Sequence, residues 1–242
     1  MVMWNPWRGC HKCSEGCRFC YIHKGDAKHG VDTNKIVKTA KITLPIEKYK
    51  RGEHAGEYKI KSGETVYLCF SSDFLLEDAD KWRMECWGII AQRPDLNFFF
   101  LTKRIERFAE CMPPDWKDGY ANVTVGCTVE NQKMADYRLA IFDTLPIRHK
   151  NIICQPLIEN IDIEDHLKDV ELVLVGGESD RNARILDYDW VLSIRSQCMR
   201  HQVNFVFRQC GSNFTKDGLL YHLNKMQLML LAGKANINIR KY

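Results

Sequence analysis

The chain has 242 residues, of which 45% are hydrophobic and 27% are charged, and its formal net charge is +4. This is the composition of a globular protein that is long enough to bury a substantial core, as one large α/β domain or two small ones. The charge favours polyanionic partners only mildly. It excludes the strongly basic composition of a dedicated nucleic-acid binder.

The apolar runs and the cysteines exclude two further classes of protein. The longest apolar runs, residues 96–101 and 172–175, are far too short to cross a bilayer. The N-terminus lacks a basic region followed by an apolar stretch, so no signal peptide is visible. Eleven cysteines, an odd number, argue against a secreted disulfide scaffold. We therefore expect a cytoplasmic protein with no membrane partner.

Seven short runs along the chain are rich in residues that favour strands. They are residues 3–9, 65–70, 97–101, 122–127, 151–154, 172–175 and 203–207. Most of them are continuously apolar, which is typical of parallel strands covered on both faces. The intervening segments read as helices, at residues 77–93, 103–111, 130–143, 160–169 and 187–201.

This alternation predicts an α/β fold, namely a (β/α) barrel, complete or partly open, of about seven parallel strands. A doubly wound sheet is the alternative, because periodicity does not show closure. We expect the barrel to span residues 1–211, with a lysine- and glycine-rich insertion at about 23–64. Residues 212–242 are expected to form a C-terminal helical extension packed on the barrel. Within it, residues 219–233 resemble one amphipathic helix whose methionines lie in the core.

Four cysteines, Cys10, Cys13, Cys17 and Cys20, lie close together in the N-terminal segment WNPWRGCHKCSEGCRFCY. They are too near in sequence for every pair to form an unstrained disulfide, which favours a metal or iron–sulfur site. The last three have the spacing C-x3-C-x2-C. Three thiolates on one loop can hold three irons of a [4Fe–4S] cluster and leave the fourth iron open to a small molecule.

Zinc is the alternative occupant of this segment. Zinc-binding cysteine pairs usually lie a dozen or more residues apart, and here the two pairs are much closer, which is cramped for one tetrahedral ion. An inert thiol cluster is the third interpretation. The other seven cysteines show no ligand spacing, and we expect most of them to be buried small hydrophobes.

With Phe19 before the last cysteine, the segment resembles the C-x3-C-x-aromatic-C signature of the radical S-adenosylmethionine (SAM) superfamily. The resemblance implies a [4Fe–4S] cluster on the loop after the first strand of the barrel. It implies that the open iron binds the amino and carboxylate groups of SAM, and that reductive cleavage yields a 5′-deoxyadenosyl radical. It also implies an electron donor such as flavodoxin or ferredoxin as a partner, and it places Phe19 at the cofactor.

Further motifs are similar to a phage-associated, radical-SAM-like family of unassigned function. They are WNPWRGC, GCRFCY, LTKR at 101–104, TVEN at 128–131, GGES at 176–179 and FRQCG at 207–211. Members of that family often show G-C-x6-C-x2-C, with no cysteine at the position of Cys13. Beside Cys17 and Cys20, the third ligand is therefore Cys13 by the superfamily spacing or Cys10 by the family pattern, and the sequence leaves both open.

Ligands in barrel and open α/β folds bind at the carboxyl ends of the strands, so polar residues there are candidates for cofactor binding. In place of the superfamily's glycine–glycine–glutamate motif, the chain has Ser71, Ser72 and Asp73, which would hold the amino group of SAM. Lys103 and Arg104 follow the next strand and could pair with a carboxylate of SAM or a substrate phosphate. A turn, a helix cap or a charged first turn is the structural alternative.

The later strands are followed by further candidates for cofactor binding. These are Thr128, Glu130 and Asn131, then Gln155 and Glu159, then Gly176, Gly177, Glu178 and Ser179, and finally Arg184 and Arg208. The group after residues 122–127 could hydrogen-bond ribose hydroxyls or the amino-acid part of SAM. The glycine pair allows the backbone to approach a ligand closely, or only makes a tight turn. The two arginines could bind an anionic substrate or the carboxylate of SAM.

These observations predict a radical SAM enzyme that modifies or repairs a substrate. The mild basicity and the lysine-rich insertion favour a nucleobase or nucleic acid, and a peptide or small metabolite is the alternative substrate. Two other functions are possible alternatives. One is a non-catalytic, zinc-binding interaction protein, and the other is a SAM enzyme in which another part of SAM reacts.

Overall fold

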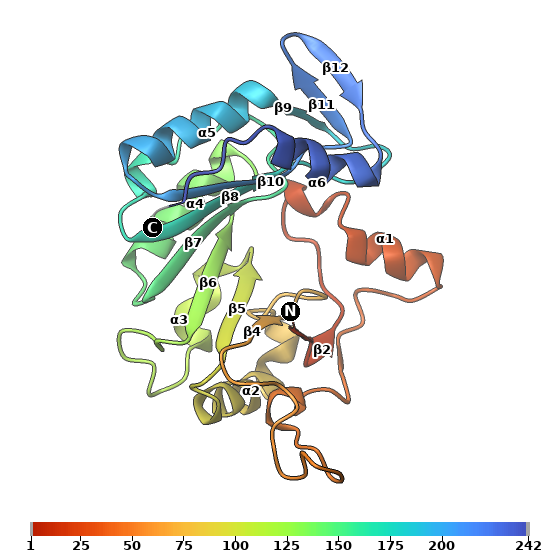
Figure 1. The fold of residues 1–242 in the computed structure, drawn as a ribbon, viewed down its shortest axis with the longest axis vertical. Coiled ribbons are helices and arrows are strands. Elements are labelled where there is room, and N and C mark those ends of the chain that lie inside the picture. Colours follow the sequence, from red (N-terminus) through yellow and green to blue (C-terminus); the bar gives the residue numbers. More distant parts are fainter. Residues whose placement is uncertain (1, 241–242) are drawn as a thin grey trace. The chain divides into compact units, whose positions relative to one another are not determined.

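The computed structural model describes residues 2–240, in which strands and helices alternate along most of the chain (Figure 1). These residues form two compact units. The first contains the residues up to His11, Gly25–Gly126 and Leu145–His149, and the second contains Lys12–Lys24, Cys127–Thr144 and the residues from Lys150 on. Cys10 therefore belongs to the first unit, whereas Cys13, Cys17 and Cys20 belong to the second.

Seven strands form one sheet in the order β1-β4-β5-β6-β7-β8-β10. They are β1 (Val2–Trp4), β4 (Thr65–Leu68), β5 (Asn97–Thr102), β6 (Val123–Thr128), β7 (His149–Cys154), β8 (Val170–Gly176) and β10 (Asn204–Gln209). The pairs β1–β4, β4–β5, β7–β8 and β8–β10 are parallel. This confirms the α/β class with seven parallel strands. Because the order advances in one direction and has two ends, the sheet is not doubly wound, and it fits the partly open form of the predicted barrel.

Helices connect most of the strands. They are α2 (Asp80–Gln92), α3 (Phe108–Cys111), α4 (Gln132–Thr144) and α5 (Tyr188–Arg200). The helices predicted at 77–93, 130–143 and 187–201 are confirmed, and the one predicted at 103–111 is reduced to the short α3 after a 3-10 turn. The helix predicted at 160–169 is wrong, because only the 3-10 turn η5 (Glu164–His166) forms there.

Strands β6 and β7 are buried on both faces, as expected, whereas β4, β5 and β8 bury one face more completely than the other. In β5 the side chains of Phe98 and Phe100 are buried, and the Phe100 ring lies 6.4 Å from the ring of Trp87 on α2. The intervening Phe99 is only half-buried. Strands β4 and β8 alternate in the same way. The expectation that the strands are covered on both faces is therefore wrong for these three strands.

The strand predicted at residues 3–9 is divided into two. Pro6 has no N–H to donate to a ladder, and the chain leaves the sheet there. β1 stays in the seven-stranded sheet, while β2 (Trp7–Arg8) pairs antiparallel with β3 (Val37–Lys38). The cysteine segment follows β2 along the chain.

The expected insertion contains helix α1 (Tyr21–Lys28), which the sequence analysis did not identify. Its later part is organised around the buried Arg93 of the first unit. The Arg93 guanidinium donates to the carbonyl of Ile60 at 2.9 Å, and it lies 4.0 Å from the ring centre of Tyr58. A buried arginine thus fixes backbone in the later part of the lysine- and glycine-rich insertion.

The C-terminal region is not purely helical. A three-stranded sheet is formed by β9 (Ile185–Asp187), β11 (Asn213–Lys216) and β12 (Leu219–His222). The prediction of one helix over 219–233 is wrong in its first part, because β12 pairs antiparallel with β11.

Helix α6 (Lys225–Lys234) begins after a capping box, in which the Asn224 side chain accepts from the backbone of Gln227 and the Gln227 side chain accepts from the backbone of Asn224. The helix packs on β10. Met226 and Met229 are 83% and 59% exposed, so the expectation that they lie in the core is wrong. Within residues 2–240, no helix has the length and apolar character needed to span a membrane.

Candidate functional site

The segment that carries Cys13, Cys17 and Cys20 is a compact turn of the second unit. The Cys17 N–H donates to the carbonyl of Ser14 at 3.0 Å, which closes the 3-10 turn η1 (Glu15–Cys17). The Cys20 N–H donates to the carbonyl of Cys17 at 3.3 Å, and Cys20 directly precedes α1. Cys17 and Cys20 are therefore held within one stretch of hydrogen-bonded backbone, and Cys13 directly precedes that stretch.

The N-terminal cysteines differ from the rest in exposure. Cys13 is exposed, and Cys10, Cys17 and Cys20 are half-buried. The other seven are buried, as predicted: Cys69, Cys86, Cys111, Cys127, Cys154, Cys198 and Cys210. Burial raises the pKa of the Cys198 thiol to about 12 and that of Cys210 to about 11. The accessible thiols among the described residues are therefore those of the N-terminal segment.

Glu130 anchors the cysteine segment through a hydrogen bond to its backbone. Its carboxylate is fully buried at the start of the connection from β6 to α4, and its Oε1 accepts from the Gly16 N–H at 3.3 Å. Its Oε2 accepts from the buried Arg138 of α4 at 2.9 Å. A Cβ at Gly16 would lie 2.9 Å from Cδ of Glu130, so only glycine allows this approach. The anchor thus depends on the three residues together.

Arg184 and Glu178 form a second anchor. The Arg184 guanidinium pairs with the nearly buried Glu178 carboxylate and donates to the backbone carbonyl of Glu15 at 2.9 Å. The Glu178 hydrogen bonds raise the pKa of Arg184. The same guanidinium lies 5.8 Å from the ring centre of Phe19, and that of Arg18 lies 5.2 Å from it. The loop after β8 therefore holds the cysteine segment at Glu15 and at Phe19.

The carboxyl ends of β7, β8 and β10 meet at one edge, as the sequence predicts. Cys154, Val175 and Phe207 are in register across the three strands. Gln155 and Arg208 therefore lie at this edge beside the glycine pair. Arg208 is exposed there.

The glycine pair itself has close neighbours inside the protein. A Cβ at Gly177 would lie 2.4 Å from Cα of Gly211, and a Cβ at Gly176 would lie 3.0 Å from Cδ of Gln155. Backbone packing against Gly211 is sufficient to require glycine at 177. Direct contact of this pair with a ligand stays a prediction.

Four other predicted residues lie around the same loops. Thr128 is buried, and Asn131 accepts through Oδ1 from the Met134 N–H at 2.9 Å, at the start of α4. Glu159 is exposed and accepts from the Gln132 N–H at 2.6 Å. Ser179 is exposed. Asn131 and Glu159 thus satisfy backbone donors at the N-terminus of α4.

In the first unit, Asp73 is the centre of the loops after β4 and β5. Its nearly buried carboxylate accepts from Thr102 Oγ1 at 2.8 Å and from the Lys103 N–H at 3.0 Å. Arg104 Nη1 lies 3.2 Å from the same carboxylate. Both oxygens therefore accept from internal donors. Binding of SAM by Asp73 stays a prediction, and its observed contacts hold the two loops together.

Arg104 also contacts the residue that begins the cysteine-rich segment. Its Nη2 donates to the carbonyl of His11 at 2.7 Å, and its Nη1 lies 3.9 Å from Sγ of Cys10. Ser72 Oγ donates to the carbonyl of Gly9. The structure thus brings Ser72, Asp73 and Arg104 together around Cys10, within the first unit.

Ser71 and Lys103 have different environments. The backbone N–H of Ser71 donates to Asn5 Oδ1 at 3.0 Å. Its Oγ is buried and has no hydrogen-bond partner among residues 2–240. Lys103 is half-buried. Ser71 thus has a buried polar atom in its side chain that is not used in an internal hydrogen bond.

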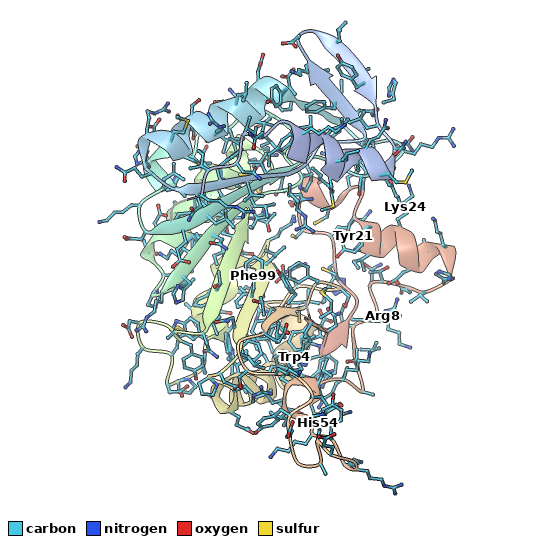
Figure 2. The ribbon with its side chains drawn as sticks, in the orientation of Figure 1. Trp4, Arg8, Tyr21, Lys24, His54 and Phe99 are labelled. Carbon is cyan, nitrogen blue, oxygen red and sulfur yellow. The ribbon has the colours of Figure 1, made fainter. Side chains whose placement is uncertain are left out.

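A small pocket of about 270 Å³ lies beside the cysteine segment, within the second unit. It is lined by Lys12, Arg18, Phe19, Cys20, His23, Lys24, Asp180 and Asn182. Figure 2 shows Lys24 and Tyr21 on α1. The sequence analysis did not single out Lys12, Arg18 or Lys24, although Lys12 and Arg18 each adjoin a cysteine in the segment.

Within residues 2–240, no three His, Cys, Asp or Glu side chains converge closely enough to hold one metal ion. The donor set of Cys13, Cys17 and Cys20 nevertheless fits an iron–sulfur cluster, because thiolates are the ligands that such clusters use. All three are at least partly accessible, and Glu130 and Arg184 fix the backbone of Gly16 and Glu15 between Cys13 and Cys17.

The chain matches the family described as "Protein of unknown function (DUF5131)" over residues 1–237. It belongs to this family. No curated protein and no solved structure matches it.

Proposed function

We propose that this member of the family is a radical SAM enzyme that binds one [4Fe–4S] cluster. The observation that carries the proposal is the contrast among the cysteines. Three partly accessible thiols follow one another on a segment anchored by Glu130 and Arg184, whereas seven others are buried. Fixed, accessible thiols on one short segment are what a cluster with an open iron requires.

We assign the three ligands to Cys13, Cys17 and Cys20. They lie in one unit, where Cys17 and Cys20 belong to one hydrogen-bonded turn and Cys13 directly precedes it. Cys10 lies in the other unit, where its Sγ is near the Arg104 guanidinium. The superfamily spacing is therefore favoured over the family pattern as the description of the ligand set.

When bound, the cluster supplies the electron that cleaves a carbon–sulfur bond of SAM. The chain's own residues position the ligand segment and bind the cofactor around it. Glu130, Glu178 and Arg184 are positioning residues, because their charged groups pair with one another or with backbone. Within the second unit, Gln155 directly after β7 and Arg208 in β10 are the side chains that we assign to SAM binding.

The test is anaerobic reconstitution of the wild type and of single Cys→Ala variants at the four N-terminal positions. We expect about four irons per chain in the wild type and a brown colour. Cys13→Ala, Cys17→Ala and Cys20→Ala should lose most of the iron, and Cys10→Ala should keep it. Retention of iron by Cys13→Ala together with its loss in Cys10→Ala would overturn the ligand assignment.

The products distinguish the two SAM reactions. With dithionite as reductant, hydrogen abstraction releases 5′-deoxyadenosine, whereas transfer of the aminocarboxypropyl group releases methylthioadenosine. We expect 5′-deoxyadenosine by liquid chromatography. Methylthioadenosine as the sole product would replace hydrogen abstraction with the alternative SAM chemistry.

A further inference from the structure

The pocket beside Cys20 is cationic. Its lining includes Lys12, Arg18 and Lys24 against the single carboxylate of Asp180, which leaves an excess of two positive charges without His23. All of these residues belong to the second unit. An ordinary solvated surface mixes both signs of charge, and this concentration of one sign in a concave site favours an anionic ligand.

The guanidinium of Arg18 is the group best placed to bind that ligand. It lies over the ring of Phe19, 5.2 Å from the ring centre. In the described part of the chain, no carboxylate or carbonyl accepts a hydrogen bond from it, whereas other arginines near the site, such as Arg138 and Arg184, are paired. A planar donor group held by an aromatic face, with its N–H groups unused, matches the oxygens of a phosphate.

The two lysines differ in how far they are already paired. Lys24 Nζ donates to the nearly buried Asp180, which lowers the pKa of that carboxyl. Lys12 Nζ makes one long hydrogen bond, 3.4 Å, to the carbonyl of Arg18. Each ammonium has three donors, so both retain donors for a second acceptor. The doubly charged phosphate group therefore matches the pocket in charge and in number of acceptors.

We propose that this pocket binds a phosphate group of the substrate. The proposal rests on the proposed function, since Cys20 is both a pocket wall and an assigned cluster ligand. A phosphate held there places a nucleotide or a nucleic-acid strand next to the cysteine segment. Arg18 and Lys12 bind the phosphate directly, and Lys24, oriented by Asp180, completes the site.

The experiment is titration calorimetry on the cluster-loaded protein at low salt. The probes are inorganic phosphate, inorganic pyrophosphate and an oligothymidylate of about ten nucleotides. The test variant is Lys12→Ala/Arg18→Ala. The matched control is Lys133→Ala/Lys168→Ala, which removes the same number of charges from exposed positions elsewhere in the second unit.

We expect the wild type and the control to bind at least one of the probes, with an affinity that falls as salt rises. The test variant should bind that probe at least about tenfold more weakly, since charge-assisted hydrogen bonds are lost. Binding of the oligonucleotide alone identifies a nucleic-acid strand as the source of the phosphate. Binding of the inorganic ions as well identifies a site for small phosphate compounds.

Equal binding by the test variant and the control would overturn the proposal, as would no binding of any probe by the wild type. If no probe binds but the test variant loses affinity for an acidic flavodoxin, the pocket is a protein-docking site and the phosphate assignment is wrong. The iron content separates the two proposals. If the wild type is colourless but binds phosphate through Arg18, the proposed cluster is contradicted and the phosphate site is not. If the wild type is brown but binds no phosphate, the proposed phosphate site is contradicted and the cluster is not.

Discussion

The backbone N–H of Gly16 donates to the buried carboxylate of Glu130 over 3.3 Å, and this bond ties the cysteine segment to the start of α4. The two residues are far apart in sequence, and Glu130 is itself fixed by Arg138. A buried carboxylate is stable only when it is paired and hydrogen-bonded. Burial of Glu130 and the position of the cysteines are therefore coupled.

Substitution of Glu130 tests its contributions to stability and to the position of the cysteine segment. Glu130→Ala leaves the buried Arg138 charge without its counter-charge, with only the Thr128 carbonyl as acceptor, and it should lower the free energy of unfolding by about 3–5 kcal/mol. Iron retention should fall with it, because Gly16 loses its acceptor. The measurements are urea unfolding and iron content after reconstitution.

The double variant Glu130→Leu/Arg138→Met is the control for stability. An apolar pair of similar size should recover most of the free energy of unfolding, since neither charge is left buried alone. It does not restore the acceptor for Gly16, so iron retention should stay low. Full iron retention in this double variant would show that the Gly16–Glu130 bond does not position the cysteines.

A methyl group at Gly16 should displace the segment. In Gly16→Ala the added Cβ meets Glu130 at 2.9 Å, and overpacking of this kind costs about 1–3 kcal/mol. The matched control is Gly25→Ala in α1, where a Cβ meets nothing within 4 Å. That change should stabilise the protein by up to about 1 kcal/mol through helix propensity. Thermal unfolding of both variants checks the difference, and equal effects would contradict the account.

Thiol labelling should separate the cysteines into two classes. In the folded apoprotein at about pH 8, we expect iodoacetamide to modify Cys10, Cys13, Cys17 and Cys20 first, because the thiolate is the reactive form and these thiols are accessible. The seven buried cysteines should react only on unfolding, as burial both shields them and raises the pKa of those such as Cys198. Peptide mass spectrometry gives the order. Early modification of Cys154 or Cys69 would contradict the observed core.

The Lys24–Asp180 pair should make stability depend on acid pH. Lys24 holds the pKa of Asp180 below its ordinary value of about 3.9. The contribution of this ion pair to the free energy of unfolding is therefore complete above about pH 4, and it is lost as the pH falls through the pKa of Asp180 in the folded state. Asp180→Asn should be less stable than the wild type near pH 6, and the difference should shrink below about pH 3.

The control for that measurement is Asp165→Asn, at an exposed position of η5. Chemical unfolding of the three proteins across this pH range gives the comparison. A difference between the wild type and Asp180→Asn that stays constant with pH would show that the pair contributes nothing through its charge.

Much of the fold follows from local sequence patterns. The apolar runs at 65–70, 97–101, 122–127, 151–154, 172–175 and 203–207 became strands of the one sheet, because each is bounded by polar residues and is too short for a helix. The run at 219–222 was assigned to a helix, and it forms β12. The sequence feature that predicts a hairpin here is the pair Asp217-Gly218, which lies between β11 and β12. Both residues have positive φ, 52° and 75°, and an Asp-Gly pair between two runs favours a hairpin.

The residues of the candidate site could be predicted from the sequence, but the contacts between them could not. The cysteines and the polar residues after each strand were identified because barrel folds place ligands there. The anchoring roles of Glu130 and Arg184 depend on residues that are distant in sequence, and neither Gly16 nor Arg138 carries a local signal of its partner. The cationic pocket was missed because lysine and arginine next to the cysteines read as ordinary surface charge.

The most direct test of the central claim is electron paramagnetic resonance of the anaerobically reconstituted, dithionite-reduced protein, with and without SAM. The account predicts a [4Fe–4S] signal that changes when SAM binds the open iron, and that is absent from Cys17→Ala. A colourless protein that holds one zinc ion, or a cluster signal that SAM leaves unchanged, would contradict it.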